Sequence, residues 1–328
     1  MGICRSLGGA FIVFLATEKQ ENFEGISVNR AFNGMHQRAA AILLLGALVG
    51  CTPTAPLPDM PDAGCTPTAA DSAGTFRFAV FGDVRPQQPN DTANYPQAVV
   101  TGLFQQIAAQ SPQLVVGTGD YMFASSTNST AVDAQLAMLL AAEQGFAGPV
   151  YHALGNHECT GATASNCPNG NETANVRAFM SKLVPAGTTT PYYRVDVDTG
   201  LGTAKIVFIA ANAWSPAQAT WLEQQLSDPT KYTFVVRHEA ASVKATAGAA
   251  ASEAIVAKHP LTLELLGHFH EYQKLDERHI ISGNGGAPLS FGNYGFLLVD
   301  LLTNGNLSVS EIDQATGSAT DTFTICPY

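Results

Sequence analysis

The chain has 328 residues, of which 46% are hydrophobic and only 13% are charged. This length and composition describe a globular protein with a sizeable core, and they exclude an intrinsically disordered chain. The formal net charge is −11, so the chain lacks the basic surplus that binds nucleic acid or an anionic lipid surface. An acidic protein can still bind a phosphate substrate, because bound cations reverse the local charge.

Residues 1–50 are expected to be an upstream segment followed by an export signal, with translation starting at Met35. A positive leader, His36–Arg38, precedes an apolar stretch of signal-peptide length, Ala39–Val49. The stretch ends in Leu-Val-Gly-Cys51, which resembles the lipobox of bacterial lipoproteins. That resemblance implies cleavage before Cys51, lipidation of Cys51, and a lipid-anchored protein of the bacterial cell envelope, periplasmic or surface-facing. A plain secretory peptide or a buried apolar helix is the alternative.

Residues 51–74 are rich in Pro, Thr, Ala and Asp, and they predict a semi-extended tether in front of a folded domain at residues 75–328. Cys159 and Cys167 bracket a polar loop in the manner of a short disulfide clip. Cys65 and Cys326 could tie the two ends of the mature chain together. The export signal favours disulfides, and free buried thiols are the alternative.

The domain opens with three strand signals, each of which ends at a Gly followed by Asp or Asn. The expected strands are Phe76–Phe81, Gln113–Val116 and Pro149–Leu154, with helices over about residues 95–109 and 131–144 between them. This alternation predicts βαβ crossovers and a parallel core sheet. The carboxyl ends of parallel strands share one edge, where α/β proteins bind ligands. We therefore expect Asp83, Asp120 and Asn156 to converge there.

The second half of the chain adds histidines at the ends of two further strands. Helices are expected at residues 174–183 and 216–226, and strands at 192–197, 205–210, 233–237, 261–266, 279–282 and 296–302. A turn at residues 198–200 joins two of these strands. The Ala-rich stretch before Lys258 carries no specific signal. The strand at 233–237 delivers His238, and the strand at 261–266 delivers His268 and His270.

The polar residues at these strand ends are of metal-ligand type: Asp83, Asp120, Asn156, His157, His238, His268 and His270. Carboxylate, amide oxygen and imidazole together suit Zn, Mn or Fe better than Ca or Mg. A shared carboxylate holds two ions roughly 3.5–4 Å apart, the separation used in two-metal hydrolysis. Each residue taken alone has a plainer interpretation, such as a structural His238 or a helix-capping Asp120.

The ordered series Gly-Asp-x-Arg (82–85), Gly-Asp (119–120), Gly-Asn-His-Glu (155–158), His238 and Gly-His-x-His (267–270) resembles the calcineurin-like metallophosphoesterase superfamily, including its purple acid phosphatase-like branch. The match covers residues 76–302. It implies an α/β fold: a four-layer αββα sandwich of two mixed sheets flanked by helices, with the metal site at strand carboxyl ends. It also implies a metal-dependent phosphoester hydrolase, in which a hydroxide bridging two Fe, Mn or Zn ions attacks phosphorus in line.

The same resemblance implies a role for each matching position. Asp83 and His270 would bind the first metal ion, and Asp120 would bridge both ions. The second ion would be completed by Asn156, His238 and His268. His157 matches the family residue that contacts the phosphate and can protonate the leaving group. The substrate would be a phosphomonoester, a phosphodiester or a nucleotide.

Arg85 departs from the commonest family pattern, Asp-x-His, whose histidine is a further ligand of the first metal ion. With three ligands left, the first site is expected to bind metal weakly or to use water or Tyr121. The purple acid phosphatase branch also lacks this histidine, and it uses a tyrosine where this chain has Phe123. Arg85 could grip a phosphate bidentately or form a salt bridge with a nearby Asp. The alternative function is a degenerate family member, a metal-binding or structural lipoprotein without turnover.

Overall fold

The structure is a computed structural model that describes residues 74, 76–159, 167 and 173–327. The expected upstream segment, the signal peptide, the lipidation site Cys51, Cys65 and all of the tether except Gly74 lie outside the described residues. None of the helices in the described part has both the length and the apolar character needed to cross a bilayer.

The first sheet has the strand order β12-β11-β10-β1-β2-β3. Its strands are β1 (Phe76–Phe81), β2 (Leu114–Gly117), β3 (Val150–His152), β10 (Gly295–Leu301), β11 (Leu307–Asp313) and β12 (Ala319–Ile325). The three strands β1, β2 and β3 are parallel, as the alternating pattern predicts, and β10, β11 and β12 extend the sheet in antiparallel fashion. Because β1, β2 and β3 are parallel, the segments that follow them lie at one edge of the sheet.

The second sheet has the order β4-β5-β6-β7-β9-β8. Its strands are β4 (Tyr193–Asp198), β5 (Thr203–Ile209), β6 (Tyr232–Arg237), β7 (Leu263–Leu266), β8 (Tyr272–Lys274) and β9 (His279–Ser282). The strands β5, β6, β7 and β9 are parallel, and β4 pairs with β5 across the expected turn. The segments after β6 and β7, which carry the late histidines, therefore also share an edge.

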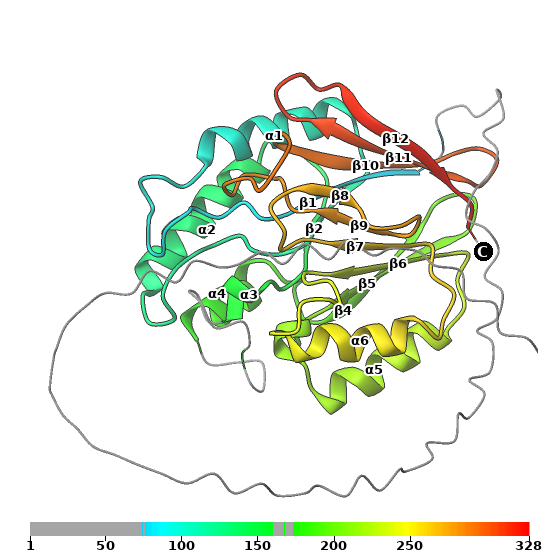
Figure 1. Cartoon of the computed structure of the whole chain (residues 1–328), viewed down its shortest axis with the longest axis horizontal. Helices are drawn as coiled ribbons and strands as arrows, with labels where there is room; N and C mark the ends of the chain where they lie inside the picture. The colour runs from blue at the N-terminus through cyan, green and yellow to red at the C-terminus, as the bar shows by residue number, and fades with distance from the viewer. Residues whose placement is uncertain (1–73, 75, 160–166, 168–172, 328) are drawn as a thin grey trace, which may run out of the picture. The chain divides into compact units, whose positions relative to one another are not determined.

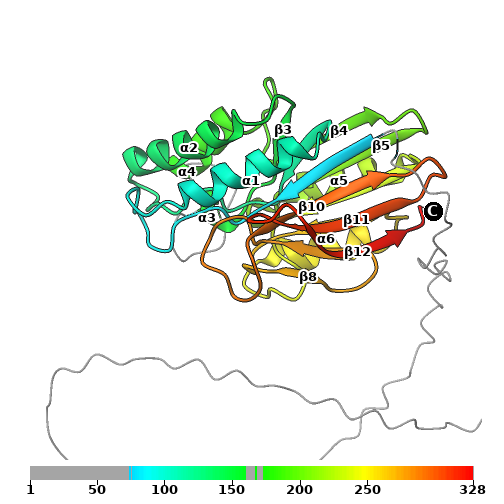
Figure 2. The ribbon, with the colours of Figure 1, turned by 90° about the horizontal axis from the view of Figure 1, so that it is seen from above.

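The helices cover the outer faces of the two sheets (Figures 1 and 2). They are α1 (Gln97–Ala109), α2 (Ser129–Glu143), α3 (Asn156–Cys159), α4 (Ala174–Lys182), the 3₁₀ turn η2 (Ala211–Ala213), α5 (Pro216–Ser227) and α6 (Ala247–Val256). On the first sheet, the α1 ring of Phe104 packs 5.1 Å from that of Phe81 in β1. On the second, Leu222 of α5 and Val256 of α6 cluster with the outer residues of β5 and β6.

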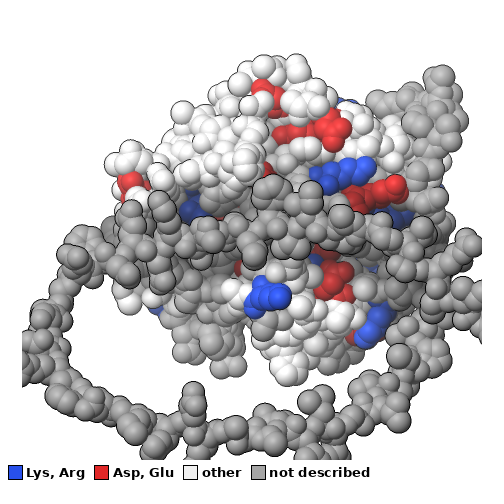
Figure 3. Space-filling view, viewed as in Figure 1, with Lys and Arg blue, Asp and Glu red and all other residues white. Residues whose placement is uncertain are grey.

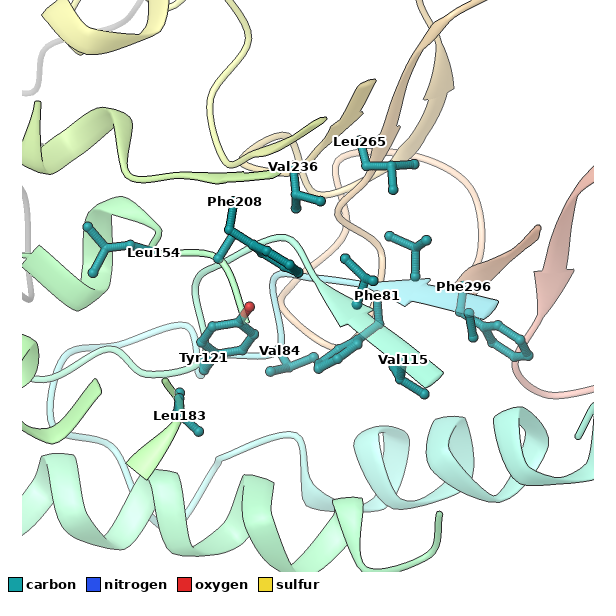
Figure 4. Packing of buried hydrophobic residues seen from close by; sticks show 14 of the residues in the cluster. Phe81, Val84, Val115, Tyr121, Leu154, Leu183, Phe208, Val236, Leu265 and Phe296 are labelled. Carbon is teal, nitrogen blue, oxygen red and sulfur yellow. The ribbon is translucent and has the colours of Figure 1, made fainter. Parts of the chain in front are cut away.

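The inner faces of the two sheets pack directly against each other. The rings of Phe78 in β1 and Phe234 in β6 meet edge to face at 5.0 Å between centroids. Figure 4 shows Phe208 and Val236 of the second sheet pointing toward the first sheet, whereas Phe81 points to the opposite face of β1, toward α1. The domain is therefore the αββα sandwich that the family resemblance implies, and its two sheets are mixed.

Charged side chains are sparse on the visible surface. On the face shown in Figure 3, the Lys and Arg side chains of the described residues lie apart from one another among acidic and uncharged ones. This agrees with the acidic composition and with the absence of a basic surplus in the sequence.

Glu311 of β11 is a buried carboxyl group, and it makes a pH-dependent contribution to stability. Burial raises its pKa to about 8, while the 2.7 Å hydrogen bond that Asn284 Nδ2 donates to Oε1 acts in the opposite direction. The folded state thus keeps a proton that the unfolded state loses above its ordinary pKa of 4.5. Stability must therefore fall as pH rises from about 4.5 to about 8.

Glu311→Gln is expected to flatten that part of the pH profile, because the amide accepts the bond from Asn284 without ionising. At pH 8 the variant should exceed the wild type by on the order of 3 kcal/mol relative to their difference at pH 5. Urea unfolding across this range measures the effect, with Asp133→Asn as control, since Asp133 is exposed and pairs with Lys182. A difference between Glu311→Gln and wild type that does not change with pH would contradict the assignment.

Candidate metal centre

Three of the predicted ligands lie on left-handed backbone, each directly after a glycine that follows the end of a strand. The φ angles are 55° at Asp83, 60° at Asp120 and 73° at His268. Such values are uncommon outside glycine, although Asp and His tolerate them better than most residues, and they cluster at functional sites. The sharp bend that each creates turns its side chain toward the common edge of the sheets.

The glycine at 119 is required by close approach as well as by its φ of 118°. A Cβ atom at this position would lie 2.5 Å from Nδ1 of His238. Gly267 is in a similar position, since a Cβ there would come within 2.8 Å of Asp83 Oδ2. The recurring Gly before a polar residue, which is visible in the sequence, thus provides the space in which these side chains meet.

The structure brings the predicted ligands together from both sheets. Nε2 of His238 lies 3.3 Å from Asp120 Oδ1 and 3.2 Å from Asn156 Oδ1. The same Asn156 oxygen lies 3.0 Å from Nδ1 of His268, whose backbone N–H donates to Asp83 Oδ2 at 2.9 Å. His270 Nε2 lies 3.6 Å from Asp83 Oδ1.

Backbone carbonyls orient two of the histidines. Nδ1 of His238 lies 2.9 Å from the Thr118 oxygen, and Nδ1 of His270 lies 2.8 Å from the Pro288 oxygen. Because a carbonyl only accepts, each Nδ1 carries the proton, and each Nε2 is turned toward the carboxylates. The sequence offers no sign of these two contacts, since they are made by backbone atoms that every residue possesses.

The centre is a buried cluster of carboxyl groups and histidines that shift one another's pKa values. Burial raises the pKa of Asp83 well above its usual value, and the neighbouring Asp120 carboxylate acts in the same direction. Burial opposes ionisation of Asp120 too, but His238 and His157 hold its pKa well below the usual value. Burial would lower the pKa of His238, yet Asp120 and Asp83 raise it well above its usual value.

The residues present fit a metal ion. Asp83 Oδ1 is fully buried and receives no hydrogen bond, although buried carboxylate oxygens are normally satisfied. Asp83, Asp120 and His238 place one donor atom each within 4.8 Å of one another, and Asn156 and His268 border the same space. Oxygen and imidazole donors of this kind suit borderline divalent cations, which would take the place of the proton on His238.

Glu158 is a structural clamp under the centre. Its Oε2 accepts hydrogen bonds from the backbone N–H groups of Asp120 (2.8 Å) and Gly155 (2.9 Å). Its Oε1 accepts from Tyr121 (2.7 Å) and Met122 (3.3 Å). Burial and the Asp120 charge raise the pKa of Glu158 to about 7. This carboxyl group holds the segment that carries Asp120 in its left-handed conformation.

His157 lies beside the predicted ligands. Its backbone N–H donates to Asp120 Oδ1 at 3.0 Å, and its Nε2 lies 3.7 Å from Asp120 Oδ2. The Phe123 ring meets the His157 ring edge to face at 4.2 Å between centroids. Asn175 Nδ2 donates a hydrogen bond to the His157 carbonyl at 3.1 Å. In the sequence, the only sign of this contact is that Asn175 is a polar residue in a helix of which about half is apolar.

Arg85 also lies at the centre. Its Nε donates to Asp120 Oδ2 at 3.3 Å, and one terminal nitrogen lies 3.1 Å from His270 Nε2. The guanidinium stacks over the Phe123 ring at 4.9 Å from the centroid. The salt bridge with an Asp, one of the two interpretations of Arg85, is therefore present, and it is made with a predicted metal ligand.

Tyr121 does not contribute a ligand, so the suggestion that it completes the first site is wrong. Its hydroxyl accepts a 3.0 Å hydrogen bond from Gly119 N–H, and its ring packs 5.0 Å from that of His152. Figure 4 shows Tyr121 among the apolar core residues. Tyr121 is buried in the core, whereas the neighbouring Asp120 carboxylate faces His238 and Arg85.

The remaining predictions concern residues outside the centre. His152, His259 and His279 match no ligand motif, and they pair with Glu143, Glu223 and Asp276, respectively. Cys159 and Cys167 form the expected disulfide, with their Cα atoms 5.0 Å apart. Cys326 is disulfide-bonded as well. Its predicted partner, Cys65, lies outside the described residues.

The sequence and the structure define a member of a known family. The sequence model of the calcineurin-like phosphoesterases matches residues 76–272, which is more than half of the chain. The chain therefore belongs to the calcineurin-like phosphoesterase family. The comparison of this sequence with curated proteins found no match.

Solved structures with this fold include proteins of different kinds. A purple acid phosphatase from yellow lupin (Lupinus luteus) seeds superposes with a TM-score of 0.57 and 17% identity, over 78% of this chain and 55% of its own. GAP50, named as the anchor in the inner membrane complex of Plasmodium, superposes with a TM-score of 0.55 and 16% identity, and the alignment covers 77% of this chain and 89% of GAP50. A dimetal phosphatase from Danio rerio superposes with a TM-score of 0.55 and 13% identity, and the alignment covers 78% of this chain and 100% of the phosphatase.

At these identities the likenesses establish the fold alone. The chain spans about half the length of the lupin phosphatase that it matches.

Proposed function

We propose that this protein is a metal-dependent phosphoester hydrolase. The observation that carries the proposal is the convergence of Asp83, Asp120, Asn156 and His238, together with the buried Asp83 Oδ1 that receives no hydrogen bond. Membership of the calcineurin-like phosphoesterase family and the likeness to two phosphatases support this chemistry.

The chain's own residues have distinct roles in the proposed reaction. Asp83, Asp120, Asn156, His238 and His268 would hold the metal. Bound metal would supply an activated water for in-line attack and would balance charge on the phosphoryl oxygens. His157, held beside Asp120 by its own backbone N–H, contacts the phosphate and donates a proton to the leaving oxygen. Arg85 places a permanent positive charge at the same edge.

A second candidate function is metal binding or a structural role without turnover. The observation that favours it is the guanidinium of Arg85 resting on Asp120 and His270, where the family's commonest pattern has a ligand. The Plasmodium protein of the same fold is named as an anchor, so this fold also occurs in a protein whose name describes anchoring. Tight metal binding with no hydrolysis of any phosphoester would support this candidate.

The test is hydrolysis of p-nitrophenyl phosphate and of bis(p-nitrophenyl) phosphate after stripping the protein and reloading it with Mn, Zn or Fe. We expect metal-dependent turnover, and at least a ~10²-fold loss in His157→Ala because the general acid is removed. His259→Ala is the matched control, since that histidine pairs with Glu223 and matches no ligand motif. Full activity in His157→Ala would contradict the assignment of the acid.

We further propose that the mature protein starts at Cys51 and is lipid-anchored in the cell envelope. The leader at residues 35–51 supports this, as does the Cys159–Cys167 disulfide, which is typical of exported proteins. Mass spectrometry of the native protein is expected to find an acylated N-terminal Cys51. Detection of residues 1–34 in the native protein would reject the proposal.

A further inference from the structure

Arg85 occupies two of the three donor atoms that a first metal ion would use. The family resemblance assigns Asp83, Asp120 and His270 to that ion, and the atoms that these residues present on the side of Arg85 are Asp83 Oδ1, Asp120 Oδ2 and His270 Nε2. Arg85 Nε donates to the Asp120 oxygen at 3.3 Å, and a terminal nitrogen lies 3.1 Å from the His270 nitrogen. The guanidinium is pinned further by the Pro86 carbonyl at 3.2 Å and by the Phe123 ring.

The contact with His270 excludes metal from that nitrogen. Nδ1 of His270 donates to Pro288 O, so Nε2 carries a lone pair. A guanidinium has donors and no acceptor, so the only hydrogen bond it can make to Nε2 uses this lone pair. A metal ion needs the same electrons. The bond from Arg85 and a metal bond at His270 Nε2 are therefore mutually exclusive.

The geometry of the ligands separates His270 from the rest. Asp83, Asp120 and His238 place donor atoms within 4.8 Å of one another. Among the described residues, no such group of three includes His270. One ion beside Asp83, Asp120 and His238 would leave the contacts of Arg85 with Asp120 and His270 in place.

We propose that this centre binds one metal ion and that the Arg85 guanidinium lies where a second cation would lie; this inference rests on the proposed function. The ligands of the single ion are Asp83, Asp120, Asn156, His238 and His268. A guanidinium supplies a fixed positive charge and a planar fork of N–H groups that matches phosphoryl oxygens. Positively charged side chains balance transition-state charge in this way in other phosphoryl-transfer enzymes.

The test counts the ions that the full-length protein holds. Wild-type protein and Arg85→His are stripped with a chelator, reloaded with Mn²⁺ and desalted, and metal and protein are then quantified. We expect one ion per wild-type chain, with the electron paramagnetic resonance spectrum of an isolated ion. We expect two ions and a spin-coupled spectrum in Arg85→His, because the change restores the Asp-x-His order and frees His270 Nε2.

Two further variants separate charge from general disruption. Arg194→His is the matched control, since Arg194 pairs with Asp196 and Asp228 away from the centre, and it should keep one ion. Arg85→Lys should also keep one ion, yet lose roughly 10²-fold in hydrolysis because the fork is gone.

Two ions in wild-type protein, no ion in wild-type protein, or one ion in both wild type and Arg85→His would overturn the inference. The hydrolysis assay tests the proposed function separately. Two-ion protein that hydrolyses phosphoesters would refute this inference alone, whereas one-ion protein without turnover would refute the function alone.

Discussion

Replacing Asp120 with asparagine is expected to abolish stable metal binding and to lower phosphoester hydrolysis by more than ~10³-fold, which corresponds to several kcal/mol of lost charge stabilisation. Both oxygens of Asp120 face donors: Oδ1 faces the His157 N–H at 3.0 Å and His238 at 3.3 Å, and Oδ2 faces Arg85 at 3.3 Å. An asparagine of the same size must turn its NH₂ group toward one of these positive neighbours.

Metal content and hydrolysis measured on the same preparation check this expectation. Asp133→Asn is a suitable control, because Asp133 forms an exposed ion pair with Lys182, and such pairs contribute little. If Asp120→Asn kept its metal and its full rate, Asp120 would have no role as a metal ligand.

Replacing Glu158 with alanine is expected to lower the free energy of unfolding by about 3–5 kcal/mol. The carboxylate accepts hydrogen bonds from the backbone N–H groups of Asp120, Tyr121, Met122 and Gly155. Alanine leaves these donors facing a buried cavity, and an unsatisfied buried group costs ~1–3 kcal/mol. Water entering the cavity recovers part of this loss, so the expected total is less than the sum.

Urea unfolding of the metal-free protein measures this effect separately from metal binding. Glu158→Gln retains one acceptor oxygen, so we expect an intermediate loss. Glu223→Ala removes an exposed partner of His259 and Lys258 and should change stability by less than ~1 kcal/mol. An unfolding midpoint for Glu158→Ala equal to that of wild type would show that the clamp does not hold the loop.

The strands and ligands that the sequence predicts most directly are those with local signals. The strands before Asp83 and Asp120 combine β-branched or aromatic residues with a terminal glycine, and parallel pairing then requires their ends to converge. The Ala-rich α6 carries no such contrast, because alanine favours helices without marking a buried face. The strands β11 and β12 follow the last predicted strand and are not predicted. The first half of β11 alternates between buried apolar and partly exposed polar residues, and most of β12 is exposed, so neither strand has a continuous apolar run.

The details of the centre depend on contacts between distant segments. Arg85 meets Asp120 across 35 residues and His270 across 185, and nothing in the local sequence encodes either approach. The direction of the Tyr121 side chain depends on the left-handed backbone at Asp120. Hydrogen bonds to Glu158 hold that backbone in place. Sequence motifs therefore predict the candidate ligands, whereas three-dimensional packing determines how many of them one metal ion could share.

The two sheets each supply part of the centre: Asp83, Asp120 and Asn156 follow strands of the first, and His238 and His268 follow strands of the second. An ion bound here would cross-link the halves of the sandwich without any covalent bond. At a free concentration a thousandfold above its dissociation constant, such a ligand adds roughly 4 kcal/mol to the folded state. Metal supply in the surroundings would then govern how long the folded protein persists, as well as how fast it works.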